Sequence, residues 1–256
     1  MSTKTSLLRL NTIKAMCVTV GCAAGLIACA SDDSEQCHAR VAGHYLDLMN
    51  LSDLDSPDAS AVERARAEFR EALHDCPVPR GGLEVPMMGR WSPAELAIAA
   101  DDFLWVSKHI DSVRRQARST AKSTESASLL NVAAGYATKR MVELLIANGF
   151  DVNRTNLGGE TPLMASAYVG LQSGTDNSEA LLRASADVNA IADNGTTALY
   201  YAVLRDNATL VELLLMHGAR VRPRGSTDDS IVSLARKRGH AEIMKLIQSA
   251  DALAAG

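Results

Sequence analysis

Small and apolar residues recur in matching blocks along the second half of the chain. The blocks open with serine or threonine, at Ser128, Thr161, Thr197 and Ser230, which lie 33, 36 and 33 positions apart. A second apolar run follows each block: Val142–Leu145, Glu179–Leu182, Val211–Leu214 and Ile243–Leu246. Two short apolar runs per period predict stacked helix pairs, because no single pair of this size can bury its apolar side alone.

Fixed sequence stations recur within each period. Thr161-Pro162-Leu163 opens one unit, with a threonine that caps a helix and a proline that suits its first turn. Asp151-Val152-Asn153 and Asp187-Val188-Asn189 follow the second apolar runs. Such stations at a period of about 33 residues resemble the ankyrin repeat. The resemblance covers Ser126 to about Gln248, and a weaker copy lies at Ser92–Ala97.

The resemblance implies an all-α ankyrin-repeat solenoid over residues 91–250. We expect about five repeats, with the first and last degenerate, and place Trp105, Val106 and Ile110 in the second helix of the first repeat. One station departs from the family, because the histidine of its T-P-L-H motif is replaced in successive units. The replacements are Asn131, Met164, Tyr200 and Ser233. The hydrogen bonds that this histidine makes between repeats are therefore in question.

Residues 29–90 predict a helical hairpin and a linker. Two apolar stripes at helical spacing mark the helices: Cys37, Val41, Tyr45 and Leu48, then Val62, Ala65, Phe69, Ala72, Leu73 and Cys76. Ser60 and Glu63 have the spacing of a capping box at the start of the second helix. Pro77 to Trp91 is rich in proline and glycine and predicts an irregular connector.

The first 28 residues have the layout of a secretory signal. A basic leader precedes an apolar core of 14 residues, Ala15–Ala28, which is shorter than the roughly 20 residues of a membrane-spanning helix. Leu26-Ile27-Ala28-Cys29 resembles the bacterial lipobox, which implies a lipid on Cys29 and a membrane tether. Cleavage after Ala30, releasing a soluble protein, is the alternative. Ala30 and Ser31 lack the aspartate that retains lipoproteins in the inner membrane, so we expect the outer membrane, facing the periplasm.

Two cysteines, Cys37 and Cys76, lie beyond Cys29. An even pair in an oxidising compartment favours a disulfide, and an antiparallel hairpin brings the start of its first helix beside the end of its second. We therefore expect a Cys37–Cys76 bond. The alternative is a metal site formed by these cysteines with His38 and His74.

Charge and motifs narrow the function. The first 28 residues hold three basic groups and no acidic one, so the remainder has 23 basic and 30 acidic residues, a net charge of −7. Such a surface repels nucleic acid and anionic lipid. The sequence has no glycine-rich phosphate loop or His-x-x-x-His run, and Gly170–Gly174 misses the pattern of a nucleophile elbow. We expect no enzymatic activity, no cofactor and no metal.

The family resemblance implies that a partner protein binds to a concave face of hairpin tips and inner helices. The contact residues expected by position are Arg154, Thr155, Leu157, Glu160, Met164, Tyr168, Ile191, Asp193, Thr196, Tyr200 and Leu204. The main hypothesis is a non-catalytic binding protein that is tethered to the membrane and faces the periplasm. One concrete form of it is an immunity protein that neutralises a secreted antibacterial toxin. The alternatives are an envelope scaffold or helper of a periplasmic enzyme, and an enzyme with its site in Cys37–Trp91.

Overall fold

The computed structural model describes residues 32–52, 58–76, 78, 83–85, 89–119, 129–169, 174–222 and 230–254. The chain divides into two compact units, Met1–Gln36 and Cys37–Gly256. The expected signal segment, residues 1–28, and the lipidation residue Cys29 lie outside the described residues. In the part that is described, no helix is both long enough and apolar enough to cross a membrane.

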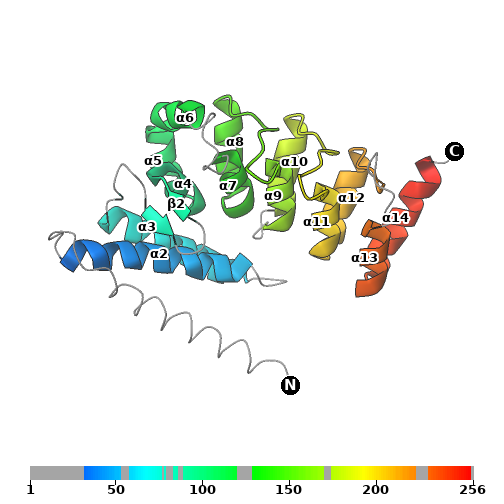
Figure 1. Ribbon diagram of the computed structural model, residues 1–256, viewed down its shortest axis with the longest axis horizontal. Coiled ribbons are helices and arrows are strands. Elements are labelled where there is room, and N and C mark those ends of the chain that lie inside the picture. Colours follow the sequence, from blue (N-terminus) through cyan, green and yellow to red (C-terminus); the bar gives the residue numbers. More distant parts are fainter. Residues whose placement is uncertain are drawn as a thin grey trace, which may run out of the picture. The chain divides into compact units, whose positions relative to one another are not determined.

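Most of the described residues are helical, which confirms the all-α class (Figure 1). The helices are α2 (Asp32–Ser52), α3 (Ala59–Asp75), α4 (Pro93–Ala99), α5 (Phe103–Lys108), α6 (Ile110–Ser119), α7 (Leu129–Tyr136), α8 (Lys139–Ala147), α9 (Pro162–Tyr168), α10 (Gly174–Arg183), α11 (Ala198–Leu204), α12 (Ala208–Met216), α13 (Ser230–Arg238) and α14 (Ala241–Ala254). Two short strands, β1 (Leu83–Val85) and β2 (Gly89–Trp91), pair antiparallel. The connector expected to be irregular therefore holds a β-ladder, in which the opposed Leu83 and Trp91 are both buried.

The helices α2 and α3 form the expected hairpin around an aromatic centre. Tyr45, Leu48 and Phe69 are fully buried. The Tyr45 ring lies 5.9 Å from that of Phe69 and 4.8 Å from that of Trp91. Because Trp91 comes from β2, the aromatic centre joins the hairpin to the short ladder that follows it.

The start of α3 differs from the expected capping box. Asp58 is the N-cap, and its carboxylate accepts from both the Ser60 amide and the Ser60 hydroxyl. Glu63 binds Arg66 at 2.7 Å instead of folding back over the helix start. Aspartate is at least as good an N-cap as serine, so the helix begins earlier than predicted, at Ala59.

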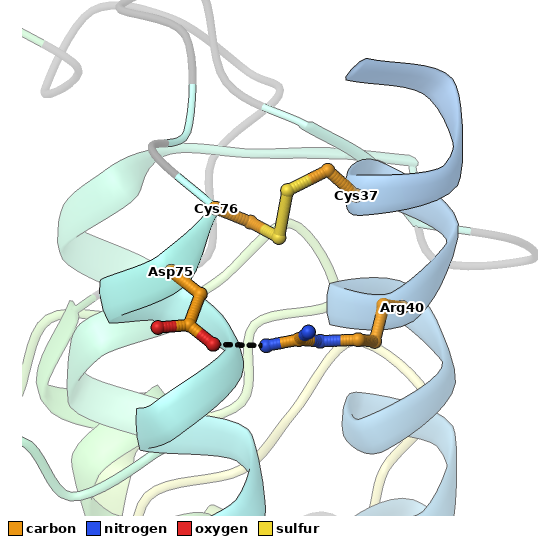
Figure 2. Close-up of a disulfide and its surroundings, with 4 residues drawn as sticks. All are labelled: Cys37, Arg40, Asp75 and Cys76. Carbon is orange, nitrogen blue, oxygen red and sulfur yellow. Dashed lines mark hydrogen bonds and ion pairs between the residues drawn. A yellow bond between two sulfur atoms is a disulfide. The ribbon is translucent and has the colours of Figure 1, made fainter. Parts of the chain in front are cut away.

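The expected disulfide is present. Figure 2 shows Cys37 near the start of α2 bonded to Cys76 at the end of α3, with Cα atoms 5.5 Å apart. Arg40 reaches across the same end of the hairpin and pairs with Asp75 at 2.6 Å. Both sulfurs are committed to the covalent bond, which overturns the alternative of a metal site at these cysteines.

Four helix pairs, α7–α8, α9–α10, α11–α12 and α13–α14, follow one another as a stack (Figure 1). The first helices contact one another in chain order, and so do the second helices. Leu130, Leu163 and Leu199, at matching positions in three first helices, are at most 1% exposed. The helices begin as the sequence predicts. The Thr161 hydroxyl accepts a hydrogen bond from the Met164 amide, and the Thr197 hydroxyl accepts one from the Tyr200 amide.

A less regular unit, the first repeat, precedes these four pairs. Its first helix, α4, opens with a complete capping box between Ser92 and Glu95. The second helix expected from Trp105, Val106 and Ile110 is divided at His109 into α5 and α6. The Asp102 carboxylate caps α5 by accepting from the Trp105 amide.

Polar side chains join the helical hairpin to the repeats, and the first repeat to the next pair. Arg66 of α3, 3% exposed, donates to the backbone carbonyl of Tyr136 at the end of α7. Arg70, one turn later, donates to the carbonyl of Ala100 at 2.9 Å. Asp101 accepts from the Thr138 amide and hydroxyl, both at 3.1 Å. Burial raises the pKa of Asp101, while the Thr138 amide and Arg66 act to lower it.

The disulfide joins two cysteines that are 39 positions apart in the sequence. Its removal should therefore destabilise the chain. We expect the C37A/C76A double variant to lose about 2–4 kcal/mol in free energy of unfolding, because the unfolded chain gains conformational freedom. Urea denaturation measures this loss. A reducing agent should lower the stability of the wild type and leave the double variant unchanged. Equal stability of the two proteins would contradict a stabilising role for the bond.

Candidate functional site

The turns between repeats are shaped by asparagine side chains. Asn156 Oδ1 accepts from the amides of Gly158 at 3.0 Å and Glu160 at 2.9 Å. Asn194 Oδ1 accepts in the same way from the Thr196 amide at 3.0 Å. These side chains stand in for backbone partners that a tight turn leaves unpaired. They hold two projecting tips, which we define as residues 153–160 and 189–196.

Neighbouring tips are in direct contact. The Asp193 amide donates to the Gly158 carbonyl at 3.0 Å. Gly159 has φ of +72°, and a Cβ atom there would lie 2.6 Å from Asp193 Oδ1 and 2.9 Å from Asp193 N. Only glycine satisfies both the backbone conformation and the lack of space. The two tips therefore act as one surface.

The asparagine of the Asp-Val-Asn station ties each repeat to the next. Asn153 Oδ1 accepts from the Asp187 amide at 2.7 Å, and Asn189 Oδ1 accepts from the Arg220 amide at 2.8 Å. The Asn189 amide group also donates to the Gly218 carbonyl at 2.9 Å. The station that marks the repeat in the sequence is thus a hydrogen-bonded link between repeats.

The missing family histidine is replaced functionally at one position. Asn131 Nδ2 donates to the Glu160 carbonyl at 2.8 Å, which bonds an inner helix to the tip of the following repeat. Met164 occupies the same station one unit later and has no polar group to offer. It is 1% exposed and packs in the core. The expectation that Met164 contacts a partner is therefore wrong, because neighbouring inner helices cover it.

Tyr201, which sequence analysis did not select, lies at the centre of the predicted residues. Its hydroxyl donates to Glu160 Oε1 at 2.7 Å and lies 3.2 Å from Thr196 Oγ1. Its ring is 5.0 Å from that of Tyr168 and 6.1 Å from that of Tyr200. Burial is the main cause that raises the pKa of Tyr201. This residue is 7% exposed, so it supports the surface from below.

We call the two tips and the exposed sides of α9 and α11 the inner face. Three large apolar side chains are exposed on it: Leu157 at 62%, Tyr168 at 47% and Ile191 at 48%. Of the other predicted residues, Thr155 and Asp193 are exposed and five are half-buried, namely Arg154, Glu160, Thr196, Tyr200 and Leu204. The inner face thus combines apolar and polar groups on a tightly bonded backbone, as a protein-binding surface requires.

Two further exposed apolar residues lie elsewhere. Leu104 of α5 is 79% exposed and Met216 of α12 is 78% exposed. Neither is on the inner face as defined by its tips and helices. Among the described residues, no group of three or more His, Cys, Asp or Glu side chains is arranged to hold a metal ion.

Comparison with known proteins identifies the repeats. Residues 130–225 and 168–253 match the family described as "Ankyrin repeats". The chain is 31% identical over 119 residues to "Ankyrin repeat protein nuc-2" of Neurospora crassa, which covers 46% of this chain and 11% of that protein. It is 35% identical over 97 residues to "Potassium channel AKT1" of Oryza sativa subsp. indica, which covers 38% of this chain and 10% of the channel. The chain thus spans about a tenth of these relatives, and its resemblance to the ankyrin repeat is confirmed.

The contact between the tips predicts an asymmetry between two glycines. Gly159 and Gly195 both have positive φ, but only Gly159 faces a neighbouring tip. We expect G195A to lose about 1–2 kcal/mol through backbone strain, and G159A to lose about 1–3 kcal/mol more because its methyl group collides with Asp193. Urea denaturation of both variants measures the difference. Equal losses would show that the tips are not closely fitted.

Proposed function

We propose that this chain, whose residues 130–253 are ankyrin repeats, is an exported, lipid-anchored protein that binds and neutralises a secreted antibacterial toxin. In this proposal it acts without catalysis, by occupying the toxin with its inner face. The single observation that carries the proposal is the set of exposed apolar side chains on that face, Leu157, Tyr168 and Ile191.

Ankyrin repeats indicate a protein–protein interaction module. The three exposed residues belong to neighbouring repeats whose tips are hydrogen-bonded together, so they are presented on a preformed backbone. A preformed surface loses little conformational entropy on binding. Apolar and aromatic side chains of this size serve as anchors when a partner covers them. These features favour a protein partner of stable shape.

Two features support export and the nature of the partner. Disulfides such as Cys37–Cys76 persist in oxidising compartments and are rare in the cytosol. The net charge of −7 beyond residue 28 favours a basic partner, because opposite charges speed association. We propose that Cys29 carries the lipid and that the chain faces the periplasm from the outer membrane.

The inner face should be required for protection. We expect a strain lacking this chain to be killed by sibling cells that secrete the toxin, and the wild-type chain to restore survival. L157D should protect at least tenfold less well, because a charge replaces an anchor at the interface. M216D is the matched control, since Met216 is also exposed, at 78% against 62% for Leu157, but lies on α12. Survival counts after co-culture give the measurement, and full protection by L157D would contradict the proposal.

The anchor is tested separately. We expect C29A to abolish incorporation of radiolabelled palmitate and to move the chain out of the membrane fraction, because the acylated residue is gone. The Cys37–Cys76 bond should form as before in this variant, which serves as the folding control. Unchanged labelling or membrane retention in C29A would refute the lipid anchor and leave the inner-face proposal standing.

A further inference from the structure

A pocket outside the inner face lies where α3 and the first repeat meet. Its volume is about 280 Å³. Apolar side chains form its walls: Leu73, Val78, Pro93 and Ala97. Trp105 of α5 completes the wall, and its ring stacks on that of His109 with centroids 4.4 Å apart. The His109 ring is itself held by a contact of 2.8 Å between Nδ1 and the Trp105 carbonyl oxygen.

Two polar residues, Asp102 and His74, also line this pocket, and Asp102 supplies its carboxylate. The Asp102 side chain is 8% exposed, and its Oδ1 accepts from the Trp105 amide at 3.0 Å. Its Oδ2 lies 3.1 Å from Nε2 of His74, whose side chain is 64% exposed. Within the described part of the chain, the one side chain in contact with Asp102 Oδ2 is therefore the His74 ring, which is accessible to solvent. An incoming group can displace such a ring at small cost.

The lining selects for a positive charge on an aliphatic stem. A carboxylate held in an apolar pocket attracts a cation more strongly than one in water does, and a cation beside an indole ring gains further attraction. The aliphatic walls suit the methylene groups of lysine or arginine. The volume is slightly below the roughly 300 Å³ at which small-molecule pockets begin. The pocket thus has room for one side chain, while the rest of the partner protein stays outside it.

We propose that this pocket binds a single basic side chain, lysine or arginine, of a partner protein. The cationic head pairs with Asp102 in place of His74, and the stem lies along the apolar walls. The site is separate from the inner face and does not depend on the toxin assignment. It gives the chain a second point of contact on its first repeat.

The test follows the two tryptophan indole signals in the proton–nitrogen spectrum of the full chain, since the sequence holds two tryptophans. N-acetyl-lysine amide, N-acetyl-arginine amide and the uncharged N-acetyl-norleucine amide are the probes. We expect the basic probes to shift the Trp105 signal, assigned with W105F, and to bind at least fivefold more tightly than norleucine amide. Equal binding of the three probes would overturn the proposal.

D102N separates the charge of the pocket from its fold. Asparagine is as good an N-cap as aspartate, so α5 should persist while the preference for basic probes disappears. D58N is the matched control, because Asp58 caps α3 on an exposed site away from the pocket. An unchanged preference in D102N would overturn the role of Asp102. H74A should tighten basic probes at least twofold, and weaker binding would overturn the displacement of His74.

A last comparison distinguishes the source of the charge. A Gly-Lys-Gly peptide and free 1,5-diaminopentane carry the same ammonium group on a similar stem. We expect the peptide to bind at least as tightly as the diamine, because the pocket opens to solvent beside His74. If the diamine bound ten times more tightly than the peptide, the ligand of the pocket would be a free amine. The proposal of a protein partner would then be overturned.

Discussion

Burial between neighbouring helix pairs is the constraint on which this structure depends. Each pair consists of helices of seven to ten residues from α7 to α12, too short to be stable alone in water. Their leucines at matching positions, Leu130, Leu163 and Leu199, are buried only because another pair lies against them. Stability is therefore a sum over neighbours, and an end without a neighbour exposes apolar surface.

The helical hairpin meets that requirement at the first end of the stack. Its aromatic centre around Tyr45 continues into the repeats, because the Tyr45 and Trp91 rings lie 6.2 and 6.5 Å from that of Tyr136. Arg66 supplies a buried charge at the same junction, where it pairs with Glu63 and donates to the Tyr136 carbonyl. Such a group is costly to bury unless its hydrogen bonds are made. The junction is thus specific as well as apolar, and it positions α3 beside Asp102.

Periodicity made the repeats predictable, and an even pair of cysteines at matching ends of a predicted helical hairpin made the disulfide predictable. The inner-face residues were only partly predictable. Met164 and Tyr168 lie on the same short helix, yet one is buried and the other exposed, since the covering neighbour is set by the stack. The repeat pattern did not single out Tyr201, because the matching position one repeat earlier holds a small residue, Ala165. The pocket was beyond sequence reasoning, as its walls come from three separate segments.

The position of the disulfide has a mechanical consequence. The bond joins Cys37, near the start of α2, to Cys76 at the end of α3. Tension applied between the N-terminal end of the chain and the repeats would run through the two sulfur atoms. The residues inside the covalent loop would carry none of that load. A pulling force would therefore reach the first repeat directly and leave the hairpin folded beside it.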